Sequence, residues 1–204
     1  MNLVAENLAS SRGGRLLFAG ISFVLAAGEA MLLLGPNGSG KTTLIRTIAG
    51  LLTPAAGSIR IDGGDPERSL GEQCHYVGHR NALKASLTVA ENATFWCRYL
   101  GRRCDGLDAA LAAFGLASLR DIPAAYLSAG QKRRLSLARV LLAYRPVWLL
   151  DEPTVSLDQA AQAALTRVMG VHLSDGGLVI AATHVPLGLS KVRKLHLGEA
   201  AGPA

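Results

Sequence analysis

Short apolar runs that stop at glycine-rich or polar turns occupy the first and last thirds of the chain, and they predict β-strands. The predicted strands cover residues 3–8, 15–18, 21–25, 31–34, 58–61, 147–150 and 178–182. Three of them, 31–34, 147–150 and 178–182, are apolar at every position rather than at alternate positions. That pattern is typical of strands in a parallel sheet with both faces covered.

The middle of the chain carries helix signals instead. Thr88 and Glu91 have the spacing of a capping box, and so do Ser128 and Gln131. The first box predicts a helix over 89–100, and the second opens a helix that ends before the next proline, which cannot continue it. Further helices are predicted over 44–49, 108–114 and 158–172.

The alternation of strands and helices predicts one α/β domain over residues 1–204. Its core part comprises 1–88 and 146–204, and the helical stretch 89–145 is a subdomain inserted into that core. No flexible linker separates the two parts, so we do not expect the insert to be an independent domain.

Composition narrows the class of protein. Half of the 204 residues are hydrophobic, yet no apolar run approaches the ~20 residues that span a bilayer. An early Glu6 without a basic segment predicts no signal peptide and a cytoplasmic location. The cysteines, Cys74, Cys97 and Cys104, are odd in number and lack metal-binding spacing, which fits reduced thiols. The net charge of +6 comes from dispersed basic residues, which predicts a solvated basic surface.

A glycine-rich turn follows the apolar run 31–34 and precedes a predicted helix. It matches the phosphate-binding pattern G-x-x-x-x-G-K-[ST] in the strand–loop–helix context that the pattern requires. Its residues are Gly35, Pro36, Asn37, Gly38, Ser39, Gly40, Lys41, Thr42 and Thr43. Glycines let backbone N–H groups surround phosphate oxygens, and the helix N-terminus adds partial positive charge. We expect Lys41 to reach the β- and γ-phosphates of ATP and the Thr42 hydroxyl to bind Mg²⁺.

Two carboxylates, Asp151 and Glu152, directly follow the apolar strand 147–150. Beside a phosphate loop, this is the arrangement that a Mg²⁺-dependent ATPase needs. Asp151 is expected to hold the magnesium ion, directly or through water. Glu152 is expected to orient and polarise the attacking water.

A further motif, at a predicted helix start, consists of Leu127, Ser128, Ala129, Gly130 and Gln131. It resembles the signature motif of the ATP-binding-cassette (ABC) family, with Ala129 where a glycine is commoner. Ser128 and Gly130 would present a hydroxyl and backbone N–H groups to an anion. The resemblance implies that each ATP lies between the phosphate loop of one chain and the signature of a second copy.

Two more markers follow in family order. Asp158 ends a segment that resembles the D-loop, and His184 resembles the switch histidine that contacts the γ-phosphate. With Lys41 and Glu152, His184 completes the expected catalytic set. The resemblance covers essentially the whole chain. It implies a P-loop α/β fold with a mixed core sheet, an N-terminal antiparallel β subdomain and an inserted helical subdomain.

Two positions depart from the family pattern. Where the family usually has a metal-binding glutamine, this chain has His79, Arg80 and Asn81. Either His79 or Asn81 takes the place of the glutamine at the metal, or neither does and Arg80 only lines a docking groove. In the loop that normally supplies an aromatic residue to adenine, Arg12 could stack through its guanidinium plane instead.

The single short cassette and the surroundings of its motifs resemble the cytochrome c biogenesis (heme exporter) branch of the family. This resemblance implies an ATP-hydrolysing subunit bound peripherally at the cytoplasmic face of the bacterial inner membrane. It would work with polytopic membrane subunits and couple hydrolysis to heme export or handling. ATP and Mg²⁺ are the expected cofactors, and neither nucleic-acid binding nor a membrane span is expected. The groove between core and insert, with residues 79–89 as its lining, is the expected docking surface.

Alternative functions are open. The chain could serve another small-molecule ABC transporter. A soluble ABC ATPase that acts on nucleic acid or ribosomes is slightly favoured by charge, but those relatives carry two cassettes or long coiled coils. A regulatory module without catalysis would be expected to lack Glu152 or Lys41, and both are present.

Overall fold

Two sheets and the helices around them make up the fold. The computed structural model describes residues 1–101 and 103–198, so the last part of the expected core, 199–204, and residue 102 of the expected insert lie outside the described residues. The smaller sheet is antiparallel, in the order β2-β1-β4. Its strands are β1 (Asn2–Arg12), β2 (Arg15–Ala26) and β4 (Ala56–Asp62).

The larger sheet has five described strands in the order β5-β6-β7-β3-β8, and every pairing between them is parallel. The strands are β3 (Ala30–Leu34), β5 (Cys74–Val77), β6 (Val147–Asp151), β7 (Leu178–Ala182) and β8 (Val192–His196). The α/β P-loop fold is therefore confirmed. The expectation of a mixed core sheet is corrected in one respect, because parallel and antiparallel pairings are segregated into separate sheets.

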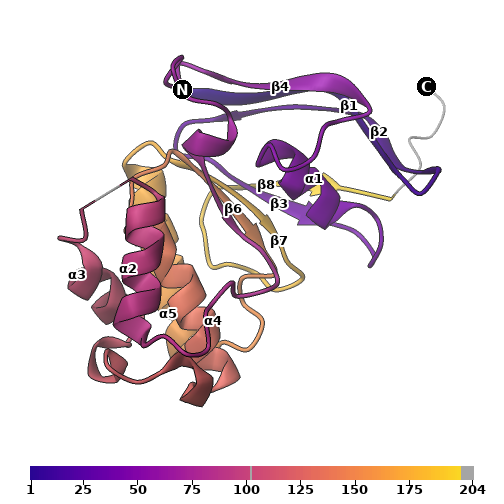
Figure 1. The fold of residues 1–204 in the computed structure, drawn as a ribbon. Helices are drawn as coiled ribbons and strands as arrows, with labels where there is room; N and C mark the ends of the chain where they lie inside the picture. The colour runs from indigo at the N-terminus through magenta and orange to yellow at the C-terminus, as the bar shows by residue number, and fades with distance from the viewer. Residues whose placement is uncertain (102, 199–204) are drawn as a thin grey trace.

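Helices cover both faces of the parallel sheet. The described α-helices are α1 (Lys41–Ile48), α2 (Val89–Tyr99), α3 (Leu107–Ala113), α4 (Ala129–Ala138) and α5 (Gln159–Ser174). In Figure 1, α1 lies between the two sheets, whereas α2, α3, α4 and α5 gather at the other side of the parallel sheet. None of the helices in the described residues is both long and apolar enough to cross a bilayer.

Strand β6 explains why the central strands read as unbroken apolar runs. Val147 and Leu149 belong to the core around α1 and the antiparallel sheet. Trp148 and Leu150 belong to the core under the insert helices and α5. Successive side chains of a strand point to opposite faces, so a strand covered on both sides must be apolar at every position.

Both predicted capping boxes are present. The Glu91 backbone N–H donates to Thr88 Oγ1 at 3.1 Å, and the Thr88 N–H donates to Glu91 Oε2 at 2.8 Å. The same reciprocal pair joins Ser128 and Gln131 at the start of α4. These bonds satisfy N–H groups that a helix leaves free at its first turn.

The antiparallel sheet and the edges of the parallel sheet differ from the predicted elements. Residues 15–18 and 21–25 form the single strand β2, because Gly20 takes a positive φ of 67° at an irregularity in the pairing with β1. Glycine tolerates this conformation, so the strand bends there and does not end. Strands β5 and β8 were missed because β5 has only four residues and β8 is a half-exposed edge strand with basic residues.

His172 on α5 is a buried histidine between the helix and the sheet. Its ring stacks on Trp148 with centroids 3.8 Å apart, and its Nε2 lies 3.1 Å from the Pro146 carbonyl oxygen. Burial lowers the pKa of His172 to about 4 against the opposing effect of its backbone hydrogen bonds. The folded protein therefore holds the His172 ring in its neutral form near neutral pH.

We predict that His172→Phe reduces the loss of stability in acid. An unfolded histidine titrates near ~6.5, so the stabilisation from the neutral ring is complete above that pH and declines as the pH falls toward 4. Phenylalanine keeps the stack, and Pro146 O still accepts a bond from Leu178 N–H. Between about pH 6.5 and pH 5, urea unfolding of the variant should lose about 2 kcal/mol less than the wild type. His79→Phe, at an exposed position, is the control, and equal losses in wild type and His172→Phe would contradict the prediction.

Candidate nucleotide-binding site

The phosphate loop joins the end of β3 to the start of α1. The Ser39 N–H donates to the Pro36 carbonyl at 3.2 Å, which closes a tight turn inside the loop. Gly35 has a φ of 136°, and a Cβ there would lie 2.2 Å from the backbone oxygen of Leu197. Only glycine therefore lets the loop pass the segment that follows β8.

Lys41, the first residue of α1, folds back across this loop. Its Nζ donates to the carbonyl oxygens of Gly35 at 2.6 Å and Pro36 at 3.0 Å. The side chain is 8% exposed, so the ammonium is held against the loop rather than in solvent. The lysine charge and the N-terminus of α1 together favour a polyphosphate at this place.

Thr42 and Asp151 come from different parts of the chain and meet beside the loop. Thr42 Oγ1 donates to Asp151 Oδ1 at 3.1 Å, and Asp151 is 3% exposed. A buried carboxylate with an adjacent hydroxyl is a pair of hard oxygen ligands, which is the donor chemistry that Mg²⁺ prefers. The two residues therefore fit the expected magnesium ion.

Glu152 and His184 lie together at the same edge of the sheet. The Glu152 backbone N–H donates to the Ala182 carbonyl at 2.8 Å, which ties the turn after β6 to the end of β7. Glu152 has a φ of 49°, a left-handed conformation that is costly for a residue with a Cβ. His184 Nε2 is 3.8 Å from Glu152 Oε1. A carboxylate so held can accept a hydrogen bond from a water molecule beside the phosphates.

Lys41, Thr42, Asp151 and Glu152 line one pocket of about 360 Å³, whereas His184 is not part of its lining. Its lining is Arg12, Leu17, Asn37, Gly38, Gly40, Lys41, Thr42, Thr43, Asp151 and Glu152. The pocket therefore brings Arg12, the residue expected beside adenine, to the phosphate loop and the carboxylates. Leu17 is an addition that the sequence did not indicate, because nothing distinguishes it from other apolar residues of β2. Neither His79 nor any signature residue is in this lining.

The signature segment is held against the D-loop. Ser128 caps α4, and a Cβ on Gly130 would lie 2.7 Å from the backbone oxygen of Ser156. Ser156 has a positive φ of 65°. Asp158 then caps α5, with its Oδ1 accepting from Ala161 N–H at 2.7 Å. Gly130 is therefore needed for close packing between the two motifs as well as for any contact with an anion.

The segment that replaces the usual glutamine faces the insert. His79 and Arg80 are exposed, whereas Asn81 Oδ1 accepts a hydrogen bond from Arg133 at 3.4 Å. Within the described residues, no group of three or more His, Cys, Asp and Glu side chains is arranged for a metal ion. His79 is not among the residues that line the pocket of Asp151.

Arg133 is the residue of this region that the sequence prediction missed. The dispersed basic residues were expected on a solvated surface, but Arg133 and Arg139 are both buried. Arg139 lies with its guanidinium 4.6 Å from the centroid of the Trp96 ring, and burial lowers its pKa to about 10. A signal was present for Arg133, since it lies four residues before the buried Leu137 on the same helix.

Fold and pocket define a P-loop ATPase of the cassette type. The model of the ABC transporter family matches residues 18–155, and the chain belongs to this family. Similar over nearly the whole length are the cytochrome c biogenesis ATP-binding export proteins CcmA of Rhodopseudomonas palustris (strain BisB5) and Nitrobacter winogradskyi. They are 55% and 54% identical, and each alignment covers 98% of this chain and 100% of the relative. The fold is also similar to the solved structure of cbiO1 from Clostridium perfringens, which is part of the ABC transporter complex cbiONQ. The TM-score is 0.74 at 30% sequence identity, and the match covers 90% of this chain and 78% of cbiO1.

We predict that Lys41→Ala and Glu152→Gln separate ATP binding from hydrolysis. Lys41→Ala leaves phosphate charge unpaired and should lose nucleotide binding. Glu152→Gln should retain binding and lower the hydrolysis rate by a factor on the order of 100 or more, since an amide does not polarise water as a carboxylate does. Equilibrium binding of a fluorescent ATP analogue and phosphate release measure the two effects. Hydrolysis at the wild-type rate in Glu152→Gln would remove Glu152 from this role.

Proposed function

We propose that the chain is the ATP-hydrolysing subunit of an exporter in c-type cytochrome biogenesis, with heme as the cargo. The observation that carries the ATPase part is the convergence of Lys41, Thr42, Asp151 and Glu152 on one pocket. The relatives named above support the cellular role, since their names specify ATP binding, export and cytochrome c biogenesis. Heme as cargo rests on the family resemblance alone.

The charged and polar residues of the pocket, together with the adjacent His184, have parts in the proposed reaction. Lys41 and the loop N–H groups bind the β- and γ-phosphates of ATP. Thr42 and Asp151 would hold Mg²⁺, which would neutralise phosphate charge. Glu152 orients the attacking water, and His184, whose ring adjoins the Glu152 carboxylate, contacts the γ-phosphate. Arg12 stacks on the adenine ring.

The site is proposed to be completed by a second copy of the chain. The signature residues 127–131 lie outside the pocket that holds the phosphate loop of the same chain. Ser128 is exposed at the N-terminus of α4, a ten-residue helix, where free N–H groups and the helix dipole favour an anion. In an ATP-bound pair, the signature of each copy would face the γ-phosphate held by the other.

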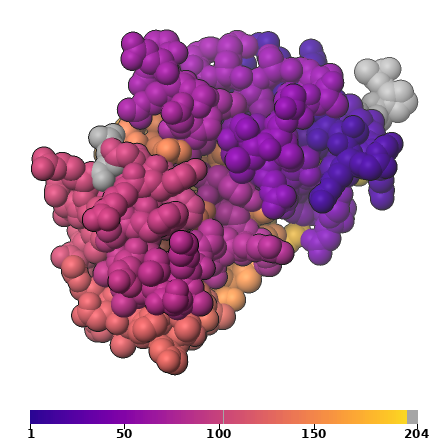
Figure 2. All heavy atoms as spheres, viewed as in Figure 1, coloured from indigo at the N-terminus to yellow at the C-terminus, as the bar shows by residue number. Residues whose placement is uncertain are grey.

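A groove between core and insert is the proposed docking surface for polytopic membrane subunits. Figure 2 shows the insert as a lobe beside the N-terminal part of the chain. A cavity of about 700 Å³ lies between the end of α1, β5 and α2, and its walls include Leu51, Trp96, Tyr99 and Arg145. Residues 79–89, the expected lining, do not line this cavity, and Val89 is fully buried. Leu87 lines a neighbouring cavity over α2, so a part of this segment in docking stays a prediction.

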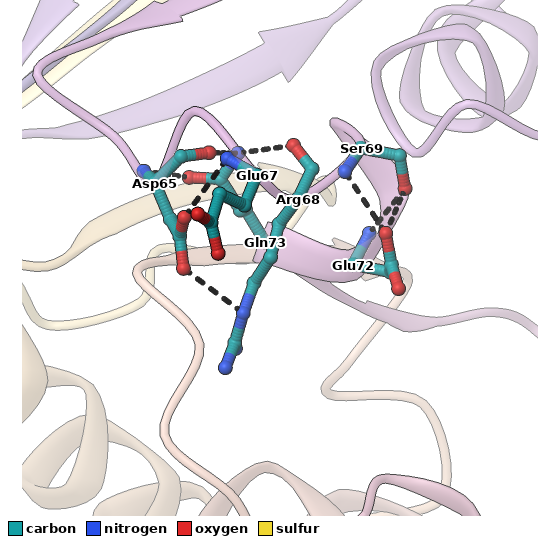
Figure 3. A network of polar contacts seen from close by, with 6 residues as sticks. All are labelled: Asp65, Glu67, Arg68, Ser69, Glu72 and Gln73. Atoms are coloured by element: carbon teal, nitrogen blue, oxygen red, sulfur yellow. Dashed lines mark hydrogen bonds and ion pairs between the residues drawn. The ribbon is translucent and has the colours of Figure 1, made fainter.

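One wall of the groove is fixed by a network of polar contacts in the loop between β4 and β5. Gln73 donates from its amide to the carbonyls of Asp65 and Arg68, both at 3.1 Å. Glu72 accepts from the N–H and hydroxyl of Ser69, and Figure 3 shows the two halves of the network side by side. These bonds lower the pKa of Glu72 and keep it charged at the rim. Hydrogen bonds within the chain thus hold this wall of the groove.

The other functions weighed from the sequence are less well supported. The insert helices α2, α3 and α4 have 11, 7 and 10 residues, far shorter than the coiled coils of DNA-repair relatives. Two of the arginines that raise the net charge are buried and cannot contact a nucleic acid. A peripheral position at the cytoplasmic face of the inner membrane follows from the proposed partners. The alternative is that the chain serves an ABC transporter for another small molecule.

ATP should drive dimerisation in the Glu152→Gln variant, because bound ATP persists when hydrolysis is blocked. Adding Ser128→Arg should prevent this dimerisation, since the larger, charged side chain would occupy the proposed binding position of the γ-phosphate. Size-exclusion chromatography with and without saturating ATP measures the change. Ser174→Arg, at the opposite end of α5 from the D-loop, is the matched control and should dimerise normally. An elution volume that does not change with ATP would count against the paired site.

Tyr99→Ser should weaken docking on the membrane subunits, because this 70% exposed ring lies at the groove. We expect less co-purification with the membrane subunits and less mature c-type cytochrome in cells, measured by heme staining. Tyr126→Ser, 82% exposed and outside the groove, is the control in nucleotide-free pull-downs.

Normal cytochrome maturation in cells that carry only Glu152→Gln would contradict the proposed function itself.

A further inference from the structure

Arg133 carries a buried charge into the contact between the insert and the core. It lies on α4, two residues beyond the signature Gln131, and is 3% exposed. Its hydrogen bonds to the described residues all end on uncharged oxygens of the core part of the chain. The guanidinium thus joins the signature helix to the core through its own fork of donors.

Three of the acceptors are successive backbone carbonyls of the turn after β6. Arg133 Nη2 donates to Asp151 O at 2.9 Å and to Glu152 O at 2.8 Å, and Nε donates to Pro153 O at 3.3 Å. This is the turn in which Glu152 takes its left-handed φ of 49°. Such a conformation persists only where neighbouring groups hold it.

The same guanidinium also holds the segment that departs from the family pattern. Nη1 donates to the Gly78 carbonyl at 2.8 Å and to Asn81 Oδ1 at 3.4 Å. One side chain of the insert therefore contacts both the catalytic turn and the loop beyond β5. A shift of α4 relative to the core would act on both loops through the same group.

Burying the Arg133 charge costs free energy of desolvation, so the side chain is a poor choice if its role is only to fill space. Burial lowers the pKa of Arg133, and the nearby Asp151 and Glu152 carboxylates oppose that effect. An apolar side chain of similar length could fill the volume without desolvating a charge. What it could not do is donate to five oxygens in two loops at once.

We propose that Arg133 is a positioning residue for ATP hydrolysis, which holds the backbone of Glu152 in its reactive conformation and couples it to the signature helix and to Asn81. The proposal rests on the role of Glu152 given above. Nucleotide binding depends on the phosphate loop, which Arg133 does not contact in the described residues, so hydrolysis and binding should respond differently to its loss.

Arg133→Met tests this in the full chain, because methionine keeps length and removes every donor. We expect kcat for ATP hydrolysis to fall by roughly 10- to 100-fold, since small misplacements of a reacting group have effects of that size, while KM for ATP changes little. Arg134→Met is the matched control. Arg134 is the next residue of α4 and donates within the insert, to Phe114 O at 3.1 Å and Gly115 O at 3.4 Å, so its loss should leave kcat near the wild-type value.

Amide hydrogen exchange separates positioning from a general loss of stability. In Arg133→Met, exchange should rise at residues 152–157 and 78–81 and stay unchanged in α1 and β7, whereas Arg134→Met should alter none of these. If Arg133→Met does not fold, Arg133→Lys is measured in the same way, because it retains one donor group and should show smaller changes of the same kind. Unchanged exchange at both loops, or an unchanged kcat in a folded variant, would overturn the proposal. Amide exchange reports how the two loops are held, whatever Glu152 does in the reaction. A failure of the proposed role of Glu152 can therefore be distinguished from a failure of the proposed role of Arg133.

Discussion

Burial of the parallel sheet on both faces is the constraint on which the site depends. Every residue of β6 and β7 is buried, between α1 and the antiparallel sheet on one side and α5 with the insert on the other. No polar group can be used along such strands without a high cost of desolvation. Chemistry is therefore confined to the strand ends. Because the strands are parallel, the ends of β3, β6 and β7 meet at one edge. The phosphate loop follows β3, Glu152 follows Asp151 at the end of β6, and His184 lies shortly after β7.

The loops at that edge are held in conformations that their residues would not adopt alone. Glu152 and Ser156 have positive φ values, and Gly35 and Gly130 leave no room for a Cβ. Glu152 is held by hydrogen bonds to Ala182 and Arg133, Gly35 packs against Leu197 after β8, and Gly130 packs against Ser156. Strain of this kind is stored at functional sites when the surrounding packing is rigid enough to maintain it.

The insert supplies more than the signature motif. Its helix α4 presents Ser128 to the outside, packs Gly130 on Ser156 and sends Arg133 into the core. The insert also lines the groove, through Trp96 and Tyr99 of α2. One short helical unit thus adjoins a proposed partner surface, a proposed dimer contact and the catalytic turn. That arrangement is suited to transmitting a change at one of these places to the others.

Local chemistry in the sequence was enough to predict the phosphate loop, the two carboxylates, both capping boxes and the three central parallel strands, β3, β6 and β7. Each of these features depends on residues that are neighbours in the sequence. The edge strand β8 and the continuity of β2 escaped prediction, since an edge strand need not be apolar and a glycine bulge looks like a turn. The buried state of Arg133 and the contact between Thr42 and Asp151 depend on residues 18 to 109 positions apart, and the walls of the docking groove likewise come from separate parts of the chain. Only packing in three dimensions decides such contacts, because the sequence alone does not say which oxygen atoms a long, flexible arginine will find within reach.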